Sequence, residues 1–365
     1  MRLVAKIGTS SITDALGVID EAVVDALCDQ LAALRTGGHE VILVSSGAVS
    51  AGVSALGMSA RPTDMPTLQA ISAAGQSRLM GTYNRSLARH GLVAAQVLLV
   101  PNDFVDRRQY LHARQTLLRL IELGCIPIVN ENDAVASHEL RYGDNDRIAA
   151  LVAHNVNADL LVLLTDTPGL FTADPRTHAT AELISEVLAD DPLLTVAAGA
   201  AGSGRGSGGM ASKLAAAKMA SWSGTRAVIA SADRAGVLVD AAAGVLVGTT
   251  FQPSVRRLAA RKLWIGFASQ VDGVISVDDG ARRALVERGT SLLPAGVTAI
   301  TGHFDEGDVV EVRDTANALV ARGMVLSDAS TLRSIIGKRT GDLPSDVAHE
   351  VIHRDDLVLL TSAGG

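Results

Sequence analysis

Aromatic residues are scarce in this chain of 365 residues, where Phe, Trp and Tyr together make up only 3%. Apolar residues nevertheless make up 48%, and Ala, Val, Leu and Gly dominate the composition. Such a composition is typical of compact α/β proteins in which helices pack closely on strands. The length is greater than one ordinary hydrophobic core serves, so we expect two domains.

Cysteine is also rare, since only Cys28 and Cys125 are present. They lie far apart in apolar stretches, which predicts buried packing of both rather than a disulfide or a metal pair. The nine histidines show no paired spacing such as His-Glu-x-x-His. No apolar run is long enough for a membrane span, and Lys6 interrupts the short run that follows Met1, which argues against a signal peptide. We therefore expect a cytoplasmic protein.

Basic residues are fewer than acidic ones, with 32 Lys and Arg against 39 Asp and Glu. Charged residues make up 19% of the chain, and the formal net charge is −7. This balance disfavours nucleic acid or an anionic membrane as the main partner. It still allows an anionic small substrate, because a few local lysines can form a positive site inside a negative protein.

Short apolar runs alternate with amphipathic segments over the first 250 residues, and Ala22–Leu34 and Tyr110–Leu123 show helical periodicity. This alternation predicts a parallel sheet that is covered by helices on both faces. The predicted strands are Leu3–Ile7, Val41–Val44, Val93–Val100, Cys125–Val129, Leu160–Leu164 and Ala227–Ala230.

Small and polar residues follow four of these predicted strands. In open parallel sheets, ligands bind beyond the carboxyl ends of the strands. One such cluster is also what an ordinary turn looks like, but four at the same edge of one sheet predict a site. The clusters are Gly8-Thr9-Ser10, Ser45-Ser46-Gly47-Ala48, Asn130-Glu131-Asn132-Asp133 and Thr165-Asp166.

A glycine-rich segment, Gly202–Gly209, leads into a helix-forming stretch that carries Lys213 in its first turn. Free N–H groups, the helix dipole and this lysine suit a phosphate, although a flexible surface loop has the same composition. Residues 204–209 match Gly-x-Gly-x-x-Gly, but no strand directly precedes them, so we do not interpret them as a dinucleotide fingerprint. The P-loop pattern is absent from the sequence.

Two further positions have more than one interpretation. Lys6 lies within the first apolar run, where a lysine costs free energy unless its charge is used; alternatively, its side chain reaches solvent from the strand end. The segment Gly143-Asp144-Asn145-Asp146 is dense in side-chain oxygens. It suits an Asx turn or a helix N-cap. It equally suits a site in which Asn145 holds a polar substrate group and an acidic residue holds two lysines apart.

The pattern changes beyond residue 250, where Gln252–Arg257 has the composition of a linker. After Trp264, short alternating runs replace the long helical segments. We expect a first domain over residues 1–251, a linker over 252–263 and a small strand-rich domain over 264–365. The predicted strands of this second domain are Gly273–Val277, Val297–Ile300 and Val309–Val312.

Taken in order along the chain, these motifs resemble those of the glutamate 5-kinases, which belong to the amino acid kinase family. The resemblance covers nearly the whole chain, and residues 264–365 resemble the PUA domain that many of these kinases carry. Departures from the family pattern occur at Ser207, Phe171 and His112. The motifs are Lys6-Ile7-Gly8-Thr9-Ser10, Ser45-Ser46-Gly47-Ala48, Asn130-Glu131-Asn132-Asp133-Ala134-Val135, Gly143-Asp144-Asn145-Asp146, Thr165-Asp166, Gly169–Arg176 and Gly208-Gly209-Met210 with Lys213.

The resemblance implies a three-layer α/β/α sandwich with a mostly parallel sheet, followed by a small β-rich PUA-like domain. It implies ATP-dependent phosphorylation of the side-chain carboxylate of L-glutamate to give L-glutamyl 5-phosphate and ADP, the first step of proline biosynthesis. Mg²⁺ would accompany ATP as the cofactor. The resemblance also implies feedback inhibition by proline, contact with glutamyl phosphate reductase, and a homo-oligomer. The charge balance and the lack of a long apolar run argue against RNA and a membrane as partners.

The resemblance assigns roles to individual residues as well. Lys6 and Lys213 would neutralise the transferring phosphoryl group, and Asp146 would orient both lysines. Glutamate would be bound by Ser46, Asp133 and Asn145. The residues that would bind ATP are Lys6, Thr165, Asp166, Ser207, Gly208, Gly209, Met210, Ala211, Ser212 and Lys213.

Three other functions fit parts of the sequence. One is another kinase of the same family, acting on aspartate, acetylglutamate, carbamate or a nucleotide, but the more specific motifs and the PUA-like tail argue against it. Another is an RNA-binding protein, because PUA domains usually bind RNA. From Trp264 onward, however, nine Arg and Lys residues face fifteen Asp and Glu residues, a balance of −6, whereas a phosphate-binding surface should be basic. The third is an inactive binding protein, which the intact Lys6, Lys213 and Asp146 disfavour.

Overall fold

The computed structural model describes residues 1–14, 17–135, 145–178, 180–188, 209–254, 258–268, 271–343 and 348–360. The chain divides into two compact units, Met1–Arg257 and Leu258–Gly365. Each unit contains a hydrophobic core cluster of its own. The division falls inside the predicted linker, residues 252–263, whose limits stay a prediction.

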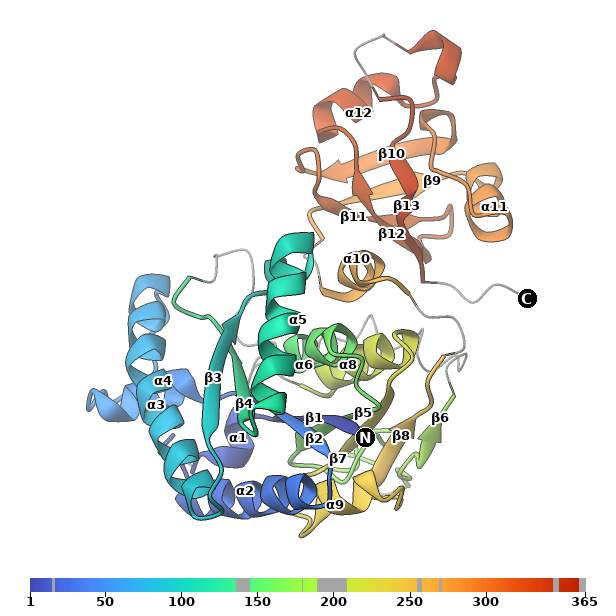
Figure 1. Cartoon of the computed structure of the whole chain (residues 1–365). Helices are drawn as coiled ribbons and strands as arrows, with labels where there is room; N and C mark the ends of the chain where they lie inside the picture. The colour runs from blue at the N-terminus through green and yellow to red at the C-terminus, as the bar shows by residue number, and fades with distance from the viewer. Residues whose placement is uncertain are drawn as a thin grey trace. The chain divides into compact units, whose positions relative to one another are not determined.

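Within the described residues, the first unit holds an eight-stranded sheet of order β3-β4-β2-β1-β5-β7-β8-β6 (Figure 1). The neighbours from β3 to β7 pair in parallel, which confirms the predicted mostly parallel sheet. Strand β8 runs antiparallel to β7, a reversal that was not predicted. The strands are β1 (Arg2–Ile7), β2 (Glu40–Ser45), β3 (Ala94–Leu99), β4 (Ile126–Glu131), β5 (Leu160–Thr165), β6 (Glu186–Val187), β7 (Arg226–Ser231) and β8 (Gly248–Phe251).

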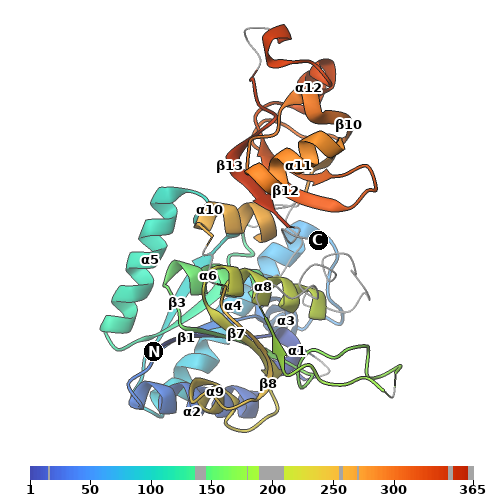
Figure 2. The same cartoon turned by 90° about the vertical axis from the view of Figure 1, so that its right-hand side faces the viewer.

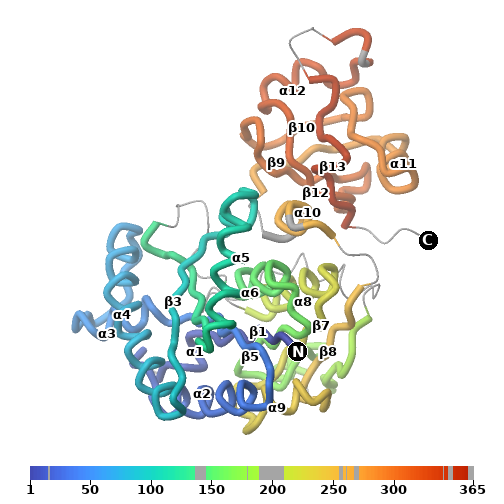
Figure 3. Tube along the Cα trace, in the orientation of Figure 1, coloured from blue at the N-terminus to red at the C-terminus, as the bar shows by residue number. Residues whose placement is uncertain are grey.

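Helices cover both faces of this sheet, as the three-layer prediction requires (Figures 1 and 2). One face carries α2, α4 and α9, and the other carries α5, α6 and α8. Helices α6 and α8 come from distant parts of the sequence but lie side by side (Figure 3). The helices of this unit are α1 (Thr9–Ile12), α2 (Glu21–Thr36), α3 (Ala48–Ala55), α4 (Met65–Ala88), the 3₁₀ turn η1 (Pro101–Phe104), α5 (Arg107–Glu122), α6 (Asn145–Asn155), α8 (Met210–Trp222) and α9 (Val237–Ala242).

Helix α2 illustrates why these segments form where they do. Asp20 caps its start by accepting hydrogen bonds from the backbone N–H groups of Ala22 and Val23. Buried residues then recur every three or four positions and face the core: Val24, Leu27, Cys28, Leu31 and Leu34.

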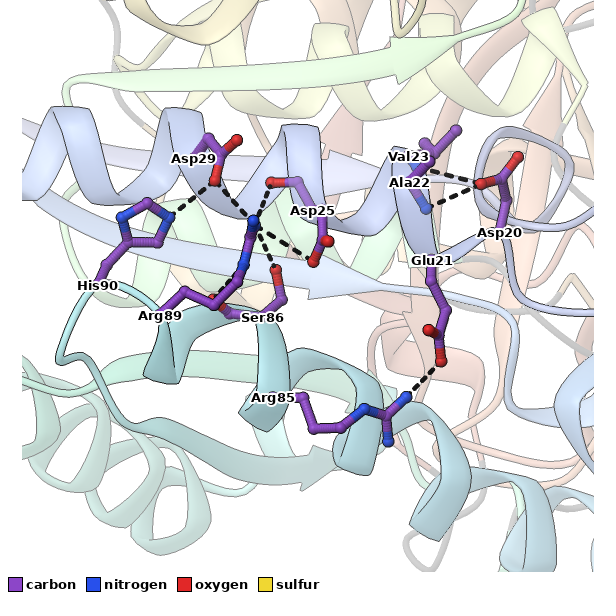
Figure 4. Close-up of polar contacts among 10 residues, drawn as sticks. All are labelled: Asp20, Glu21, Ala22, Val23, Asp25, Asp29, Arg85, Ser86, Arg89 and His90. Carbon is purple, nitrogen blue, oxygen red and sulfur yellow. Dashed lines mark hydrogen bonds and ion pairs between the residues drawn. The ribbon is translucent and has the colours of Figure 1, made fainter.

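The polar face of α2 meets α4 through exposed ion pairs (Figure 4). The guanidinium of Arg89 lies 2.9 Å from Asp29 and 3.2 Å from Asp25, and Glu21 pairs with Arg85. Exposed pairs of this kind contribute little individually. The apolar stripe therefore supplies most of the stability of this contact.

The cysteines differ from the prediction in one respect. Cys28 is fully buried in α2, and burial raises the pKa of its thiol to about 11, which keeps it protonated and unreactive near neutral pH. Cys125 lies just before β4 and is partly exposed, so the prediction that both cysteines are buried is wrong for this one. Both thiols are free.

The second unit is built around a five-stranded sheet of order β10-β9-β11-β12-β13 in its described part. This confirms the predicted β-rich domain, and its first three strands match the predicted runs. Strands β12 and β13 were not predicted, because charged residues such as Arg322 and Asp355 interrupt their apolar alternation. The elements are α10 (Ala260–Leu263), the π-helical turn η2 (Trp264–Ala268), β9 (Gly273–Val277), α11 (Asp279–Arg288), η3 (Pro294–Gly296), β10 (Val297–Gly302), β11 (Val309–Arg313), β12 (Leu319–Val325), α12 (Ala329–Ile335), η4 (Thr340–Asp342) and β13 (Ile352–Leu359).

In the part of the chain that the structure describes, no helix combines the length and the apolar character needed to cross a membrane.

Candidate active site

The predicted polar clusters come together at the carboxyl edge of the sheet. Strands β4, β2, β1 and β5 are neighbours and run in parallel, so their carboxyl ends lie side by side. Lys6 lies near the end of β1, Ser46 directly follows β2, and Thr165 ends β5. Strand β4 continues through Asn130 and Glu131, which is further than predicted.

A charged cluster forms where β1, α6 and α8 meet. The ammonium group of Lys6 lies 2.7 Å from Oδ1 of Asp146, and that of Lys213 lies 3.2 Å from Oδ2. Ser212 donates its hydroxyl hydrogen to the same Oδ2 at 3.1 Å. Lys6 and Lys213 are only 3% and 4% exposed, and Asp146 is fully buried. The alternative in which Lys6 reaches solvent from the strand end is therefore wrong.

The electrostatics of this cluster explain how a buried carboxylate stays ionised. Burial alone raises the pKa of Asp146, but the ammonium groups of Lys6 and Lys213 outweigh it and hold the pKa below its ordinary value. The three side chains together carry two positive charges and one negative charge. Such a group is suited to an anionic ligand.

A neutral hydrogen-bond network begins one residue earlier on α6. The side-chain amide of Asn145 donates to the hydroxyl of Ser46 at 3.0 Å and to Oδ1 of Asn130 at 2.9 Å. Its own oxygen accepts from the backbone N–H of Glu131 at 3.2 Å. Asn145 is 4% exposed and contacts strand ends on two neighbouring strands. Its side chain therefore belongs to the sheet edge and does not cap its own helix.

Helix α4 supplies two polar side chains that sequence reasoning missed. Gln76 accepts from the Nδ2 of Asn130 at 2.8 Å, and Ser72 donates to Asp133 at 2.7 Å. Ser72 and Gln76 are 4% and 7% exposed, and they stand one helical turn apart. Their positions fall among apolar residues of the helix such as Leu68 and Leu79, which are buried. A polar side chain at such a position needs a hydrogen-bond partner, and this pattern could have indicated the two residues from the sequence.

Two glycines bring α4 close enough for these contacts. A Cβ atom on Gly52 of α3 would lie 1.8 Å from the backbone oxygen of Ile71, and one on Gly75 of α4 would lie 1.8 Å from that of Ala48. Only glycine permits such a close helix–helix approach. Gly47, with φ of 105°, makes the left-handed turn that starts α3 directly after β2.

Asp133 is a buried carboxylate of a different kind. It is 7% exposed and lies beyond the end of β4. Burial raises its pKa, and this effect outweighs the hydrogen bond from Ser72 and the charge of Arg61, which act in the opposite direction. Its ionised form is therefore less favourable in the folded chain than in water.

The residues predicted to bind ATP are only partly placed. Thr165 donates to Asp166 at 3.1 Å at the end of β5. Gly209 caps α8, whose first turn contains Met210, Ala211, Ser212 and Lys213. The other predicted members, Ser207 and Gly208, lie outside the described residues, as do Gly143 and Asp144 of the Gly-Asp-Asn-Asp motif.

Among the described residues, no group of three or more His, Cys, Asp and Glu side chains is arranged to hold a metal ion.

The model of the amino acid kinase family matches residues 1–231, and the PUA domain model matches residues 273–344. Among solved structures, the UMP kinase from Bacillus anthracis covers 70% of this chain and 96% of its own, at 16% identity and a TM-score of 0.47. At that distance, the likeness tells nothing about the substrate.

Curated relatives are much more similar. A protein from Streptomyces avermitilis named glutamate 5-kinase is 47% identical over 365 residues, covering 98% of this chain and 96% of the relative. Proteins of the same name from Salinispora arenicola and Caldanaerobacter subterraneus are 47% and 44% identical, covering 98% and 99% of this chain and 98% of each relative. The chain therefore belongs to the amino acid kinase family, and its nearly full-length similarity places it among the members named glutamate 5-kinase.

Proposed function

We propose that the chain transfers the γ-phosphoryl group of ATP to the side-chain carboxylate of L-glutamate, giving L-glutamyl 5-phosphate and ADP. This is the first step of proline biosynthesis. The observation that carries the proposal is the buried cluster of Lys6, Asp146 and Lys213 beside a polar network at the same sheet edge. The name shared by the relatives supports the choice of acceptor.

The chemistry requires charge stabilisation more than proton transfer. A glutamate side chain titrates near pH 4.3, so the attacking carboxylate is already ionised at neutral pH and needs no general base. The difficulty is that two anions must meet. Lys6 and Lys213 are fixed in place before the reaction, so they stabilise the charge that develops on the transferring group without having to reorganise. Asp146 holds the two ammonium groups at a defined separation.

Nucleotide binding is assigned to the start of α8 and the end of β5. The first N–H groups of α8, from Gly209 onward, are suited to phosphate oxygens because of their free donors and the helix dipole. Thr165 and Asp166 would contact the rest of the nucleotide. We infer that Mg²⁺ enters with ATP, since Mg²⁺ in kinase sites is held largely by the phosphates and water, and it would neutralise part of the phosphate charge.

Glutamate binding is assigned to Ser46, Asp133 and Asn145. The carboxylate of Asp133 suits a free α-ammonium group, which would supply the positive charge that its buried position calls for. Acetylation would remove that charge and leave the carboxylate buried without its partner. Aspartate, one methylene shorter, would leave its own carboxylate short of the γ-phosphate by roughly an ångström, enough to slow transfer severely.

The remaining parts of the proposal concern the cell. An ATP-dependent kinase works where ATP is supplied, so we place the protein in the cytoplasm. Inhibition by proline, contact with glutamyl phosphate reductase, and a homo-oligomer stay predictions from the resemblance to the family.

Trapping of the acyl phosphate tests the proposal directly. With ATP, Mg²⁺ and hydroxylamine, we expect glutamate to give hydroxamate, and aspartate and N-acetylglutamate to give little. A parallel assay of ADP release should include UMP, which reacts at oxygen without forming a hydroxamate. Efficient turnover of N-acetylglutamate, or ADP release with UMP alone, would move the chain to another branch of the family.

A further inference from the structure

Helix α4 places the hydroxyl of Ser72 against the carboxylate of Asp133. Ser72 donates to Oδ2 of Asp133 at 2.7 Å, and the two side chains are 4% and 7% exposed. A serine inside a helix commonly donates to the carbonyl four residues earlier, which for this position is that of Leu68. Here the hydrogen goes to a residue 61 positions away in the sequence. The bond therefore joins α4 to the site and contributes nothing to the helix itself.

The distance of Ser72 from the sheet edge is set by a backbone contact. Ser72 stands one helical turn before Gly75, which packs against Gly52 of α3 so closely that neither position has space for a Cβ atom. A helix held by such an approach cannot move toward or away from the site without losing that contact. The hydroxyl is thus in place before any ligand arrives, and a donor of this kind needs no reorganisation.

The carboxylate of Asp133 has few groups that favour its charge. Within the described part of the chain, the hydroxyl of Ser72 is its one hydrogen-bond donor. In the same part, Arg61 of the loop between α3 and α4 acts on it through charge and forms no ion pair with it. Burial raises the pKa of Asp133, and Ser72 and Arg61 oppose that effect. Ser72 is therefore the direct contact that favours the ionised form.

The other carboxylate oxygen of Asp133 is left for a ligand. No residue that the structure describes donates a hydrogen bond to Oδ1, and Asp133 lies beyond β4 at the edge where the acceptor substrate is proposed to bind. A carboxylate whose one oxygen is held by a neutral hydroxyl keeps its full negative charge. Its second oxygen is suited to a cation, and the α-ammonium group is the cation that glutamate brings.

We propose that Ser72 is a positioning residue of the acceptor site, which holds Oδ2 of Asp133 so that the ionised carboxylate presents Oδ1 to the α-ammonium group of glutamate. The inference rests on the proposed function and deepens it by adding a residue of α4 to the acceptor site. Ser72 does not touch the substrate. It acts through Asp133, whose role as a substrate contact is unchanged.

Ser72→Ala tests the proposal by removing one oxygen atom. We expect the KM for glutamate to rise on the order of 10-fold, because a hydrogen bond to a charged group is lost. The values of kcat and of the KM for ATP should stay within about a factor of two, since Lys6 and Lys213 are untouched. Ser72→Thr keeps a hydroxyl and should return the KM for glutamate toward the wild-type value. An unchanged KM for glutamate in Ser72→Ala overturns the inference.

The pH profile of kcat/KM for glutamate separates a positioning role from a structural one. This profile reports the ionisation of groups in the free enzyme. Without Ser72, the ionised form of Asp133 loses a favourable contact, so the acid limb should move to higher pH. The ratio of wild type to Ser72→Ala should therefore increase as pH falls from about 8 to about 5, because burial and Arg61 act equally on both proteins. A ratio that stays constant over this range indicates a structural role and overturns the inference.

Ser86→Ala is the matched control on the same helix. Ser86 is 2% exposed, and its hydroxyl accepts from Arg89 at 3.3 Å. It lies about 21 Å further along α4 than Ser72, at about 1.5 Å per residue. The variant should lose stability and keep the wild-type KM and pH profile. If it moves the pH profile as far as Ser72→Ala does, the effect comes from the helix as a whole, and the inference fails.

Melting without substrate gives a second measurement, which does not depend on activity. Because burial raises the folded pKa of Asp133 and the loss of Ser72 raises it further, Ser72→Ala should melt below the wild type near pH 7. The difference should become smaller as pH falls below the ordinary aspartate pKa of about 3.9, where the carboxyl is protonated in both proteins. In an Asp133→Asn background, Ser72→Ala should shift the melting temperature by an amount that does not change with pH. A shift independent of pH in both backgrounds overturns the inference.

The wild-type chain separates this inference from the proposed function. If it forms no hydroxamate from glutamate, the proposed function fails, and the inference fails with it before any variant is made. If the wild-type chain is active and Ser72→Ala keeps the wild-type KM and pH profile, the inference alone fails.

Discussion

Asn145 and Asp146 are neighbours in the first turn of α6, yet they belong to two regions of opposite character. Asp146 joins Lys6 and Lys213 in a cluster of formal charges. Asn145 joins a network of neutral amides and hydroxyls. The sheet edge is thus divided, with the ion-paired cluster on the side of β1 and α8, and with amide and hydroxyl hydrogen bonds and the separate carboxylate of Asp133 on the side of β4 and α4.

The two buried carboxylates show what this division achieves. The pKa of Asp146 is held below its ordinary value by the two ammonium groups, which outweigh the effect of burial, whereas burial raises the pKa of Asp133. Environments that shift the pKa values of two titratable groups in opposite directions often indicate that the groups have different roles in one site. Asp146 already has its counter-ions within the protein, and Asp133 is suited to one that arrives with the substrate.

The largest effect is expected from Asp146→Asn. It leaves two ammonium groups buried without their shared carboxylate, and breaking a buried ion pair in this way costs about 3–5 kcal/mol of unfolding free energy. Urea denaturation near pH 7 measures the loss. Because the folded pKa of Asp146 is lowered, its contribution is present above the pKa of the unfolded chain and is lost as pH falls through the folded pKa. The difference in unfolding free energy between wild type and variant should therefore become smaller in acid. An unchanged urea midpoint near pH 7 would contradict the role of the cluster.

Lys213→Ala should act on the rate more than on binding. We expect kcat to fall by a factor on the order of 10² to 10³, the scale for one preorganised electrostatic contact, with a small change in the KM for glutamate. Lys218→Ala on the same helix is the control, since Lys218 is also buried but lies 5.0 Å from the centre of the Trp222 ring. It should lower stability and leave kcat near the wild-type value. A wild-type kcat in Lys213→Ala would contradict the assignment.

Asp133→Asn should change the stability of the ligand-free fold in the opposite direction from Asp146→Asn. The raised pKa means that ionised Asp133 destabilises the ligand-free fold, so the variant should melt at a higher temperature than the wild type at pH 7. The difference should fade as pH falls below the ordinary aspartate pKa of about 3.9, where the wild-type carboxyl is protonated. The KM for glutamate should rise on the order of 10- to 100-fold, since a charge-assisted hydrogen bond is lost.

Adding glutamate tests the difference between wild type and Asp133→Asn through ligand binding. It should raise the melting temperature of the wild type, and N-acetylglutamate should not, while Asp133→Asn should respond weakly to both. If Asp133→Asn melts below the wild type and binds glutamate normally, then Asp133 is a structural residue, and the division between the two carboxylates does not hold.

Most of the site at the carboxyl edge of the sheet could be predicted, because buried parallel strands appear in the sequence as uninterrupted apolar runs. In β1, the residues Leu3, Val4 and Ala5 are fully buried, and no alternation obscures the strand. The rule that ligands bind beyond the carboxyl ends then directs attention to the residues that follow each run. Ser46 was found in this way, whereas Lys6 was singled out because a lysine within a buried apolar run costs free energy unless its charge is used.

The contributions of α4 could not be found by that rule. Whether Ser72 and Gln76 face solvent or the site depends on how closely α4 approaches α3, and the contact between Gly52 and Gly75 determines that distance. This is a property of two helices together and leaves only a weak pattern in either. The same holds for β8, whose antiparallel direction depends on the path of the chain between two strands.

The smallest effect is expected from removing the second unit. Both regions of the site lie within Met1–Arg257, and the core cluster of this unit is built from its own residues. A chain that ends at Arg257 should therefore keep kcat and both KM values within about a factor of two, as expected when distant sites are independent. The measurement is the coupled ADP-release assay with ATP and glutamate, with circular dichroism to verify that the fragment is folded. A folded but inactive fragment would mean that the second unit takes part in catalysis.

Fluorescence anisotropy at low salt, with labelled RNA and both chain lengths, tests the other function considered for this unit. Since acidic residues outnumber basic ones from Trp264 onward, we expect weak binding by either chain, and tight binding that needs the second unit would assign it an RNA partner.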